Sequence, residues 1–366
     1  MAQDDNAWLV LAHAYINTSE LDGLKQYFGD VGAIITQSRS RLQEAGLDET
    51  KSAAIASPDR AKIDAALAWL QHDRHHLLAF GTDDYPELLT QIPGAPLILY
   101  VNGRIDALHM PSLAIIGSRN PTEGGRRNAT EFSRHLARQG FAIVSGLAKG
   151  IDTAAHSGAL EAKGTTLALL GHGIDRVYPA NNRALAHAIS ENGALVTEYP
   201  LGSPPERRHF PERNRLISGL SLGTLVVEAA RRSGSLITAR LAADQGREVF
   251  ALPGSIHNPL SRGCHALIKQ GAKLIETAGD ITRELAPLTG HMLQNTIEST
   301  SNEAPPTLAD DDYDELRAAL SHDPVSIDEL AERCGLTIGQ LSSMLLLLEL
   351  HGEVESLSGG RYALLG

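Results

Sequence analysis

Two short apolar runs with a polar-faced segment between them constrain the fold more than any other part of the sequence. The runs cover residues 113–116 and 141–144, and each is apolar along its whole length and rich in β-branched residues. This composition is typical of strands buried on both faces. In residues 123–139, Phe132 and Leu136 are spaced to face a sheet while four arginines can face water, which predicts an amphipathic helix. Strand, helix and strand in this order form a parallel βαβ unit.

The same alternation continues to about residue 288. Further strands are predicted at 96–101, 165–170, 194–199, 224–228, 248–252 and 273–275, and helices at 153–162, 183–191, 235–245 and 265–270. The pattern predicts an α/β fold, an extended Rossmann-like doubly wound sheet that is mostly parallel. Ligands of such sheets bind at the carboxyl ends of the strands, so we expect the strand exits to converge on one edge.

The chain divides into four predicted segments. Residues 1–75 predict a small bundle of short helices, with one helix expected over 31–42, and residues 76–288 form the sheet domain. Residues 289–312 are rich in Thr, Ser, Asn and Pro without an apolar period, which indicates a linker. Residues 313–366 predict three helices and a hairpin around Gly359 and Gly360, the arrangement of a winged helix.

The net charge of −12 is unevenly distributed. Residues 111–288 hold 21 Lys and Arg against 15 Asp and Glu, a net charge of +6. Residues 1–110 hold 8 against 15 and residues 289–366 hold 3 against 14, giving −7 and −11. A basic middle favours a polyanionic ligand, and acidic flanks favour protein partners or solvation. Ordinary variation of surface charge between domains remains an alternative for the flanks.

Several classes of protein are disfavoured. No apolar stretch approaches the roughly 20 residues that span a bilayer, and the first residues lack the basic and apolar regions of a signal peptide. The two cysteines, Cys264 and Cys334, suit a reducing cytosol and have no metal-ligand spacing. No GxGxxG motif follows the first strand and no phosphate-binding P-loop occurs. We therefore expect no cofactor and no metal.

Small residues and single cations follow the first two strands of the sheet domain. Gly117 and Ser118 precede Arg119 after the first strand, and Gly146 precedes Lys149 after the second. Glycines let a ligand approach the backbone, N–H groups at a helix start attract anions, and a cation adds charge. We interpret Arg119 as a phosphate clamp, whereas Lys149 fits a surface lysine equally well.

Residues 207–219 combine four arginines with one aromatic residue. Arg207, Arg208, Arg213 and Arg215 surround Phe210, and Pro211 is expected to hold Phe210 extended in a loop. Cations with an aromatic ring form a platform for single-stranded nucleic acid. The alternative is a charged loop with Phe210 in the core.

Two further expectations concern acidic and histidine side chains near the same edge. Glu228 is expected to pair with an arginine and hold it in place. Asp152 and His156, four residues apart on a helix, are interpreted as a packing pair, because no Ser or Cys nucleophile motif accompanies them.

Six segments together resemble the DNA-processing protein A family, also called Smf. They occur in family order at residues 116–119, 145–156, 178–182, 210–215, 228–238 and 252–255. The resemblance implies a cytoplasmic, non-enzymatic, DNA-binding protein of natural transformation (competence) and DNA recombination. Such a protein would bind single-stranded DNA, protect it and load the RecA recombinase, acting as a homodimer through the Rossmann-like domain. It also implies a sterile-alpha-motif-like (SAM) bundle and a winged helix at the two ends.

The motifs carry family roles to individual residues. Ser118 and Arg119 would contact phosphate, Arg183 would add a cation, and Phe210 would stack on a base. The predicted DNA-binding residues are Gly117, Ser118, Arg119, Gly146, Lys149, Arg183, Arg207, Phe210, Arg213, Asn214, Arg215 and Ser233.

Two other functions are considered. A nucleotide-processing enzyme of the lysine-decarboxylase-like phosphoribohydrolase type has a similar sheet, but its Pro-Gly-Gly-x-Gly-Thr loop is absent here. A transcription regulator would read duplex DNA through the winged helix. The helix expected at 338–351 contains no Lys or Arg, so we expect no DNA binding by this acidic module.

Overall fold

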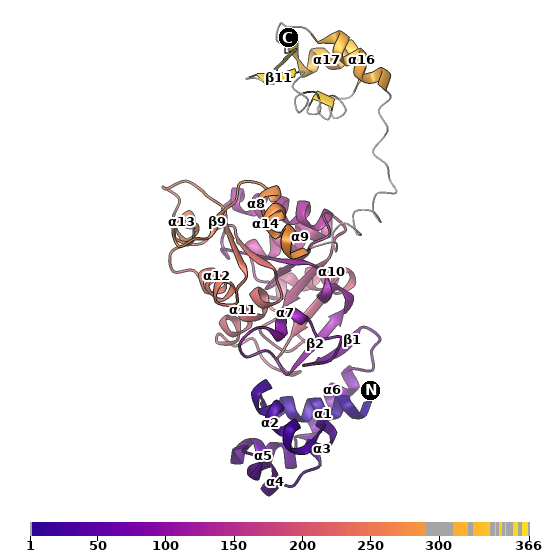
Figure 1. Ribbon diagram of the computed structural model, residues 1–366, viewed down its shortest axis with the longest axis vertical. Coiled ribbons are helices and arrows are strands. Elements are labelled where there is room, and N and C mark those ends of the chain that lie inside the picture. The colour runs from indigo at the N-terminus through magenta and orange to yellow at the C-terminus, as the bar shows by residue number, and fades with distance from the viewer. Residues whose placement is uncertain are drawn as a thin grey trace. The chain divides into compact units, whose positions relative to one another are not determined.

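The computed structural model describes residues 2–289, 310–320, 325–336, 341, 344, 345, 348, 354–357 and 361–364 (Figure 1). The chain divides into two compact units, residues 1–298 and 299–366. No helix of the described part is long and apolar enough to cross a membrane.

The N-terminal part is a helical bundle, as predicted. Its helices are α1 Ala2–His13, α2 Thr18–Phe28, α3 Val31–Ile35, α4 Arg39–Glu44, α5 Glu49–Ala56 and α6 Arg60–Trp69. The expectation of one helix over 31–42 is wrong. Ser38 accepts a hydrogen bond from the Arg41 N–H and starts α4 as a new helix, because a serine at this position satisfies a free backbone donor.

Nine strands form one sheet in the order β1-β2-β6-β5-β4-β3-β7-β8-β9. Their bounds are β1 His75–Ala79, β2 Ile98–Gly103, β3 Ser112–Ile116, β4 Ala142–Ser145, β5 Thr166–Leu169, β6 Ala194–Thr197, β7 Gly223–Val226, β8 Glu248–Ala251 and β9 Lys273–Leu274. β3 to β9 are parallel, whereas β2 is antiparallel to both β1 and β6. The mostly parallel, doubly wound sheet is confirmed.

Helices cover both faces of this sheet. They are α7 Glu87–Thr90, α8 Glu123–Arg138, α9 Ile151–Glu161, α10 Arg183–Asn192, α11 His209–Gly219, α12 Ser235–Asp244, α13 Arg262–Lys269 and α14 Ala278–Thr289. Successive strand residues point to opposite faces. Leu113 and Ile115 of β3 therefore pack with α8 and α9, whereas Ala114 and Ile116 pack with α11 and α12. This two-sided burial explains the uninterrupted apolar runs.

Aromatic contacts join the bundle to the edge of the sheet. Tyr100 of β2 is fully buried, and its ring lies edge-on to Trp69 with 6.0 Å between centroids. Its hydroxyl lies 3.4 Å from Nε2 of His13. The bundle therefore shares a hydrophobic core with the sheet. The boundary predicted between residues 75 and 76 falls just after the first residue of β1.

The second unit contains the elements of the predicted winged helix. These are α16 Asp310–Ala319, β10 Val325–Ser326, α17 Ile327–Cys334, β11 Val354–Leu357 and β12 Arg361–Leu364. β11 and β12 form the predicted antiparallel hairpin. Ser326 and Glu329 form a capping box that starts α17, and Gly335 ends it at φ 65°. Most of the linker predicted at 289–312 and most of the helix predicted at 338–351 lie outside the described residues.

His156 ties α9 to two strands of the sheet. Its Nε2 accepts from the Leu147 N–H at 3.4 Å, so Nδ1 carries the proton and donates to the Thr166 hydroxyl at 2.7 Å. Thr166 in turn donates to the Ile143 carbonyl. Burial, with a smaller effect from Arg213, lowers the pKa of His156 to about 3. The fold therefore requires neutral His156, whose partners in the described structure are Leu147 and Thr166 and not Asp152.

We expect His156 to make the fold acid-sensitive. The ordinary pKa of a histidine is 6.5, whereas that of His156 in the folded chain is about 3. Between these two pH values the unfolded chain therefore binds a proton at His156 that the folded chain does not. Its stabilising contribution is complete above pH 6.5 and falls by about 1.4 kcal/mol per pH unit below it. Urea unfolding should be measured at pH 7.5 and 5.5 for the natural protein and for His156→Gln, whose amide oxygen can still accept from the Leu147 N–H. Between these two pH values the free energy of unfolding should fall more in the natural protein than in His156→Gln. Equal losses in both proteins would contradict the assignment.

Candidate functional site

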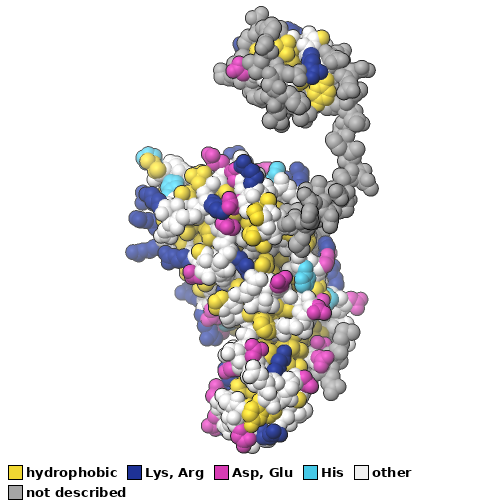
Figure 2. All heavy atoms as spheres, viewed as in Figure 1, with side chains coloured by type: hydrophobic (Ala, Val, Ile, Leu, Met, Phe, Trp, Pro, Cys, Tyr) yellow, Lys and Arg dark blue, Asp and Glu magenta, His cyan; other side chains and the backbone are white. Residues whose placement is uncertain are grey.

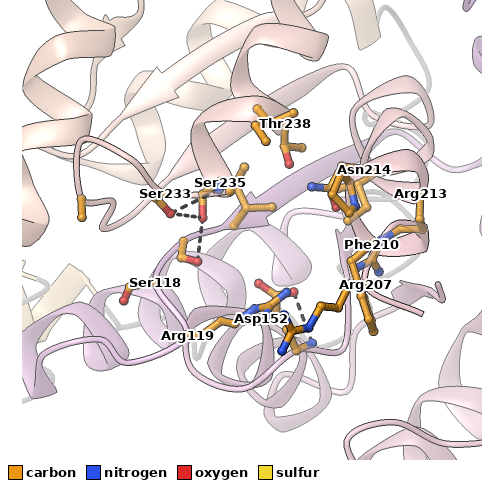
Figure 3. A pocket seen from close by; sticks show the side chains of 18 of the residues that line it. Ser118, Arg119, Asp152, Arg207, Phe210, Arg213, Asn214, Ser233, Ser235 and Thr238 are labelled. Carbon is orange, nitrogen blue, oxygen red and sulfur yellow. Dashed lines mark hydrogen bonds between the residues drawn. The ribbon is translucent and has the colours of Figure 1, made fainter. Parts of the chain in front are cut away.

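A cavity of about 860 Å³ opens at the carboxyl edge of the sheet (Figure 3). It lies between the exits of β3 and β7, neighbours in the sheet at which the strand order reverses. Doubly wound sheets bind ligands at this point. Its walls come from residues 116–119, 148, 152, 178, 205–217, 230–238 and 260, with gaps in these ranges.

Of the predicted site residues, the structure brings eight together around this cavity. They are Gly117, Ser118, Arg119, Arg207, Phe210, Arg213, Asn214 and Ser233. Gly146, Lys149, Arg183 and Arg215 are not part of its lining; Lys149 and Arg183 are exposed.

Gly150 allows the segment after β4 to contact the segment after β3. Its φ is +85°, and a Cβ at this position would lie 2.3 Å from the Ser118 carbonyl oxygen. The Ile151 N–H, at the start of α9, donates to the same oxygen at 3.1 Å. A side chain at position 150 would push the Ser118–Arg119 segment away from α9, so the glycine fixes the backbone that carries Arg119.

Arg213 is buried beneath the cavity and braces the exits of β4 and β5. Its guanidinium donates to the carbonyls of Gly146, at 3.0 Å, and Leu169. Asp152 accepts from the N–H groups of Gly146 and Ala148, at 3.1 and 3.3 Å. Burial lowers the pKa of Arg213 to about 10, so it remains a cation at neutral pH. Burial raises the pKa of Asp152, an effect that Arg213 opposes.

This arrangement corrects the expectation that Gly146 and Arg213 are open to a bound strand. Only 3% of Arg213 is exposed, and a Cβ on Gly146 would lie 2.6 Å from its guanidinium nitrogens. Gly146 therefore makes room for the guanidinium. Both residues position the site from within, because Arg213 is buried and its guanidinium donates to the carbonyls of Gly146 and Leu169.

The segment predicted as an arginine-rich loop is in fact the start of helix α11. Pro211 falls in its first turn, where a backbone N–H has no helical partner, so the proline does not interrupt the helix. Phe210 is consequently helical and not extended, which corrects that prediction. Phe210 and Asn214 lie one turn apart and both face the cavity.

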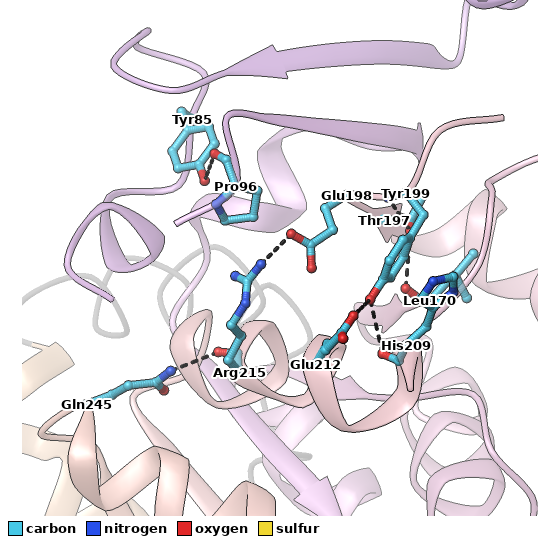
Figure 4. Close-up of polar contacts among 10 residues, drawn as sticks. All are labelled: Tyr85, Pro96, Leu170, Thr197, Glu198, Tyr199, His209, Glu212, Arg215 and Gln245. Atoms are coloured by element: carbon cyan, nitrogen blue, oxygen red, sulfur yellow. Dashed lines mark hydrogen bonds and ion pairs between the residues drawn. The ribbon is translucent and has the colours of Figure 1, made fainter. Parts of the chain in front are cut away.

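The side of α11 that faces away from the cavity is bonded to the two residues that follow β6 (Figure 4). Arg215 forms an ion pair with Glu198, and the Tyr199 hydroxyl donates to the Glu212 carboxylate at 3.0 Å. Burial raises the pKa of Glu198, and Arg215 opposes this shift. Arg215, which was predicted to bind DNA, therefore points away from the cavity and holds α11 in place.

Glu228 does not have the predicted arginine partner in the structure. Its carboxylate accepts from the N–H and hydroxyl of Thr122, at 2.9 and 2.6 Å. Thr122 caps α8 by accepting from the Gly125 N–H, and a Cβ on Gly125 would lie 2.4 Å from the Glu228 carboxylate. Glu228 thus has a structural role, but it fixes the start of α8 and does not hold an arginine in place.

Two aromatic rings form one wall of the cavity. The rings of Tyr178 and Phe210 lie 5.6 Å apart at 44°, and the Arg119 guanidinium lies 5.8 Å from the centre of the Phe210 ring. Phe210 is half-buried and Tyr178 is 49% exposed. The sequence interpretation missed Tyr178, although it belongs to the motif at 178–182. The wall offers stacking surface next to a cation.

Hydroxyl groups and a helix start form the facing wall. The Ser233 hydroxyl accepts from the Ser235 N–H at 3.3 Å, and the Ser235 hydroxyl donates to the Gly117 carbonyl at 2.8 Å. Ser235, also missed from sequence, thereby joins the exit of β3 to the first turn of α12. Helix starts attract anions, and Arg207 adds an exposed cation at the rim. Figure 2 shows dark blue Lys and Arg side chains along the left edge of the middle part of the molecule.

Comparison with known proteins identifies the family. Residues 76–286, more than half of the chain, match the family model described as DNA recombination-mediator protein A. The chain belongs to the DprA/Smf family. Residues 300–360 match the DprA winged helix domain, which confirms the winged helix predicted from sequence.

Relatives in the DprA/Smf family are similar along most of the chain. Protein Smf of Escherichia coli is 42% identical over 320 residues, covering 87% of this chain and 85% of that protein. DNA processing protein DprA of Streptococcus pneumoniae is 46% identical over 202 residues, covering 55% of this chain and 71% of that protein.

Two solved DprA structures share the fold. The X-ray structure of DprA from S. pneumoniae has a TM-score of 0.68 and 35% identity, covering 76% of this chain and 97% of that one. The structure of DNA processing protein A from Helicobacter pylori, which concerns its single-stranded DNA binding mode, has a TM-score of 0.53 and 31% identity. It covers 58% of this chain and 96% of that one.

Proposed function

We propose that this chain binds single-stranded DNA in the cavity at the carboxyl edge of the sheet. The observation that carries the proposal is the wall formed by Tyr178 and Phe210 with Arg119 against it. An aromatic surface stacks on any unpaired base, and a cation beside it attracts the neighbouring phosphate. The family relationship supports the proposal, because the H. pylori relative has a described single-stranded DNA binding mode.

Within the cell, we infer a cytoplasmic role in natural transformation. The bound protein would protect incoming DNA and load the RecA recombinase on it, without catalysing a reaction. Asp152 and His156 support a non-enzymatic role, since both are buried and bonded to backbone or to Thr166. The phosphoribohydrolase and transcription-regulator alternatives are not favoured, because the family match covers both the sheet domain and the winged helix.

Replacing Arg119 should reveal its phosphate contact. With the full chain, we expect fluorescence anisotropy to show tighter binding of a single strand than of a duplex of the same length. Arg119→Ala should weaken single-strand binding and lower the slope of log affinity against log salt by about 0.7, the value for one phosphate contact. Arg138→Ala removes the same charge from the exposed end of α8, outside the cavity, and serves as the control. Unchanged affinity and slope in a folded Arg119→Ala protein would refute the assignment.

Phe210 should contribute stacking beyond the charges around it. Stacking on one base is worth about 1–3 kcal/mol, so Phe210→Ala should lose roughly ten- to a hundredfold in affinity with an unchanged salt slope. Phe210→Trp should retain binding. If Phe210 only filled the core, Phe210→Ala would melt at a lower temperature and bind with full affinity, so both quantities should be measured on one preparation.

The sheet domain should also form a homodimer, as we infer from the family relationship. Because the winged helix and the bundle can add contacts of their own, the full chain and residues 76–288 should both be examined by light scattering. A dimeric mass for both at micromolar concentration would support the proposal. A monomeric mass for both would exclude this assembly.

A further inference from the structure

The interface between the helical bundle and the sheet contains two histidines that the proposed function does not use. His75 is the first residue of β1, and His13 is the last residue of α1. Both side chains are half-buried. Because strand residues alternate between faces, His75 lies on the same face of the sheet as Leu77, which packs against the core shared with the bundle. Neither histidine lines the cavity.

His75 is stacked on Trp69, the last residue of the bundle's final helix. The two rings lie 3.9 Å apart with 8° between their planes, and Nδ1 of His75 lies 2.8 Å from the Trp69 carbonyl oxygen. A carbonyl only accepts, so Nδ1 carries the proton and Nε2 is the nitrogen that can bind a second one. The His72 ring lies 4.4 Å from His75 on a plane 27° from parallel. The stack therefore contains His75 in its neutral form.

A second proton on His75 is unfavourable in this stack. An indole face attracts a cation, but His72 and His76 can become cations themselves and then repel it. Burial lowers the pKa of His75, the hydrogen bond to Trp69 opposes this shift, and His72 and His76 add to it. The closed interface therefore favours neutral His75.

His13 contacts the sheet at Tyr100. Its Nε2 lies 3.4 Å from the Tyr100 hydroxyl, and Tyr100 is fully buried with its ring edge-on to Trp69. Burial lowers the pKa of His13, the Lys62 ammonium lowers it further, and Asp59 opposes the shift. Lys62 and Asp59 form an ion pair with each other at 2.9 Å, so their effects on His13 partly cancel. Burial against the sheet therefore keeps His13 neutral as well.

The charges around the two histidines do not compensate an added proton. Asp73 is exposed and Asp59 bonds to Lys62, so neither carboxylate is bonded to a histidine in the described structure. The Arg74 guanidinium donates to the Ser190 carbonyl of α10. Within the described residues, the titratable and charged groups around the pair are His72, Asp73, Arg74 and His76 beside His75, and Tyr15, Asp59, Lys62 and Tyr100 beside His13.

We propose that the interface between the bundle and the sheet is a proton-sensitive latch, closed while His13 and His75 are neutral and opened when they bind protons. Once released, both imidazoles return to an ordinary pKa of 6.5. Below this pH the open form takes up protons that the closed form excludes. The opening equilibrium therefore rises by up to about tenfold per pH unit for each histidine. Acid thus separates the bundle from the sheet without unfolding either part.

Hydrogen exchange in the full-length protein tests the latch. The Gly103 N–H donates to the Arg74 carbonyl and the His75 N–H to the His72 carbonyl, both at 2.9 Å, so these two amides report on the junction. Their protection factors, corrected for intrinsic exchange, should fall by up to about a hundredfold between pH 7.5 and 5.5 in the natural protein. The fall should be up to about tenfold in His13→Gln or His75→Phe and absent in the double variant.

These substitutions remove the titration and keep the contacts. His13→Gln leaves an amide within reach of the Tyr100 hydroxyl, and His75→Phe leaves a ring against Trp69. A second measurement uses fluorescence, because the chain has two tryptophans. With Trp8→Phe in every protein, Trp69 emission should shift to longer wavelength on acidification, since its half-buried ring becomes exposed. The double histidine variant should show no shift.

A matched control is His257→Gln, which removes an exposed histidine after β8, far along the strand order from β1. It should respond to pH as the natural protein does. Protection that does not depend on pH in the natural protein, or an equal fall in the double variant, would refute the latch. A single variant that falls as much as the natural protein would exclude its histidine. Loss of helical circular dichroism over the same range would indicate global unfolding and would also overturn the proposal.

Discussion

The Arg213 guanidinium, buried at the carboxyl ends of β4 and β5, joins three elements that meet at the cavity. It donates to the carbonyls of Gly146 and Leu169, and it extends from α11, which carries Phe210 and Asn214. Burying a cation is unfavourable unless its donors are satisfied. The two carbonyl acceptors and the nearby Asp152 offset part of that cost here, while Nε of Arg213 has no partner within the described residues. Removing any one of these groups would leave a charge unpaired under the site, so the cavity wall depends on this interaction.

A second interaction fixes the orientation of α11. Arg215 and Glu212 contact Glu198 and Tyr199 at the end of β6, while residues 210 and 214 face the cavity. Residues one turn apart share a helix face, so one rotation of α11 determines both sets of contacts. The position of Phe210 relative to Tyr178 therefore follows from ion pairs and hydrogen bonds on the far side of the helix. The wall formed by Tyr178 and Phe210 is therefore positioned by groups outside the lining of the cavity.

More of the backbone fold than of the side-chain roles could be predicted from the sequence. The βαβ core was predictable because strands buried on both faces must be apolar throughout, and the cavity position followed from the direction of parallel strands. β1 was missed, since its first residues, His75 and His76, are half-buried and lack an apolar run. The start of α11 was mistaken for a loop because Pro211 was expected to hold Phe210 in an extended conformation. Pro211 lies in the first turn of α11 only because the helix begins at His209. Tertiary packing determines where the helix begins.

Side-chain roles were harder to predict because they depend on residues distant in sequence. Arg213 is buried only because position 146, 67 residues away, has no side chain to exclude it. Arg207, Arg213 and Arg215 were predicted to bind DNA, yet Arg213 and Arg215 are engaged in the fold. Nε of Arg208, in the same segment, forms an ion pair with the Glu206 carboxylate at 2.8 Å. The positive charge of a sequence segment therefore overestimates how many of its arginines remain open to a ligand. At about 0.7 per phosphate contact, we expect Arg119 and Arg207, the exposed arginines in the described lining of the cavity, to give a salt slope of about 1.4 per chain. A steeper dependence would require cations outside the cavity, and the exposed Lys149 and Arg183 are placed on the same sheet domain to supply them.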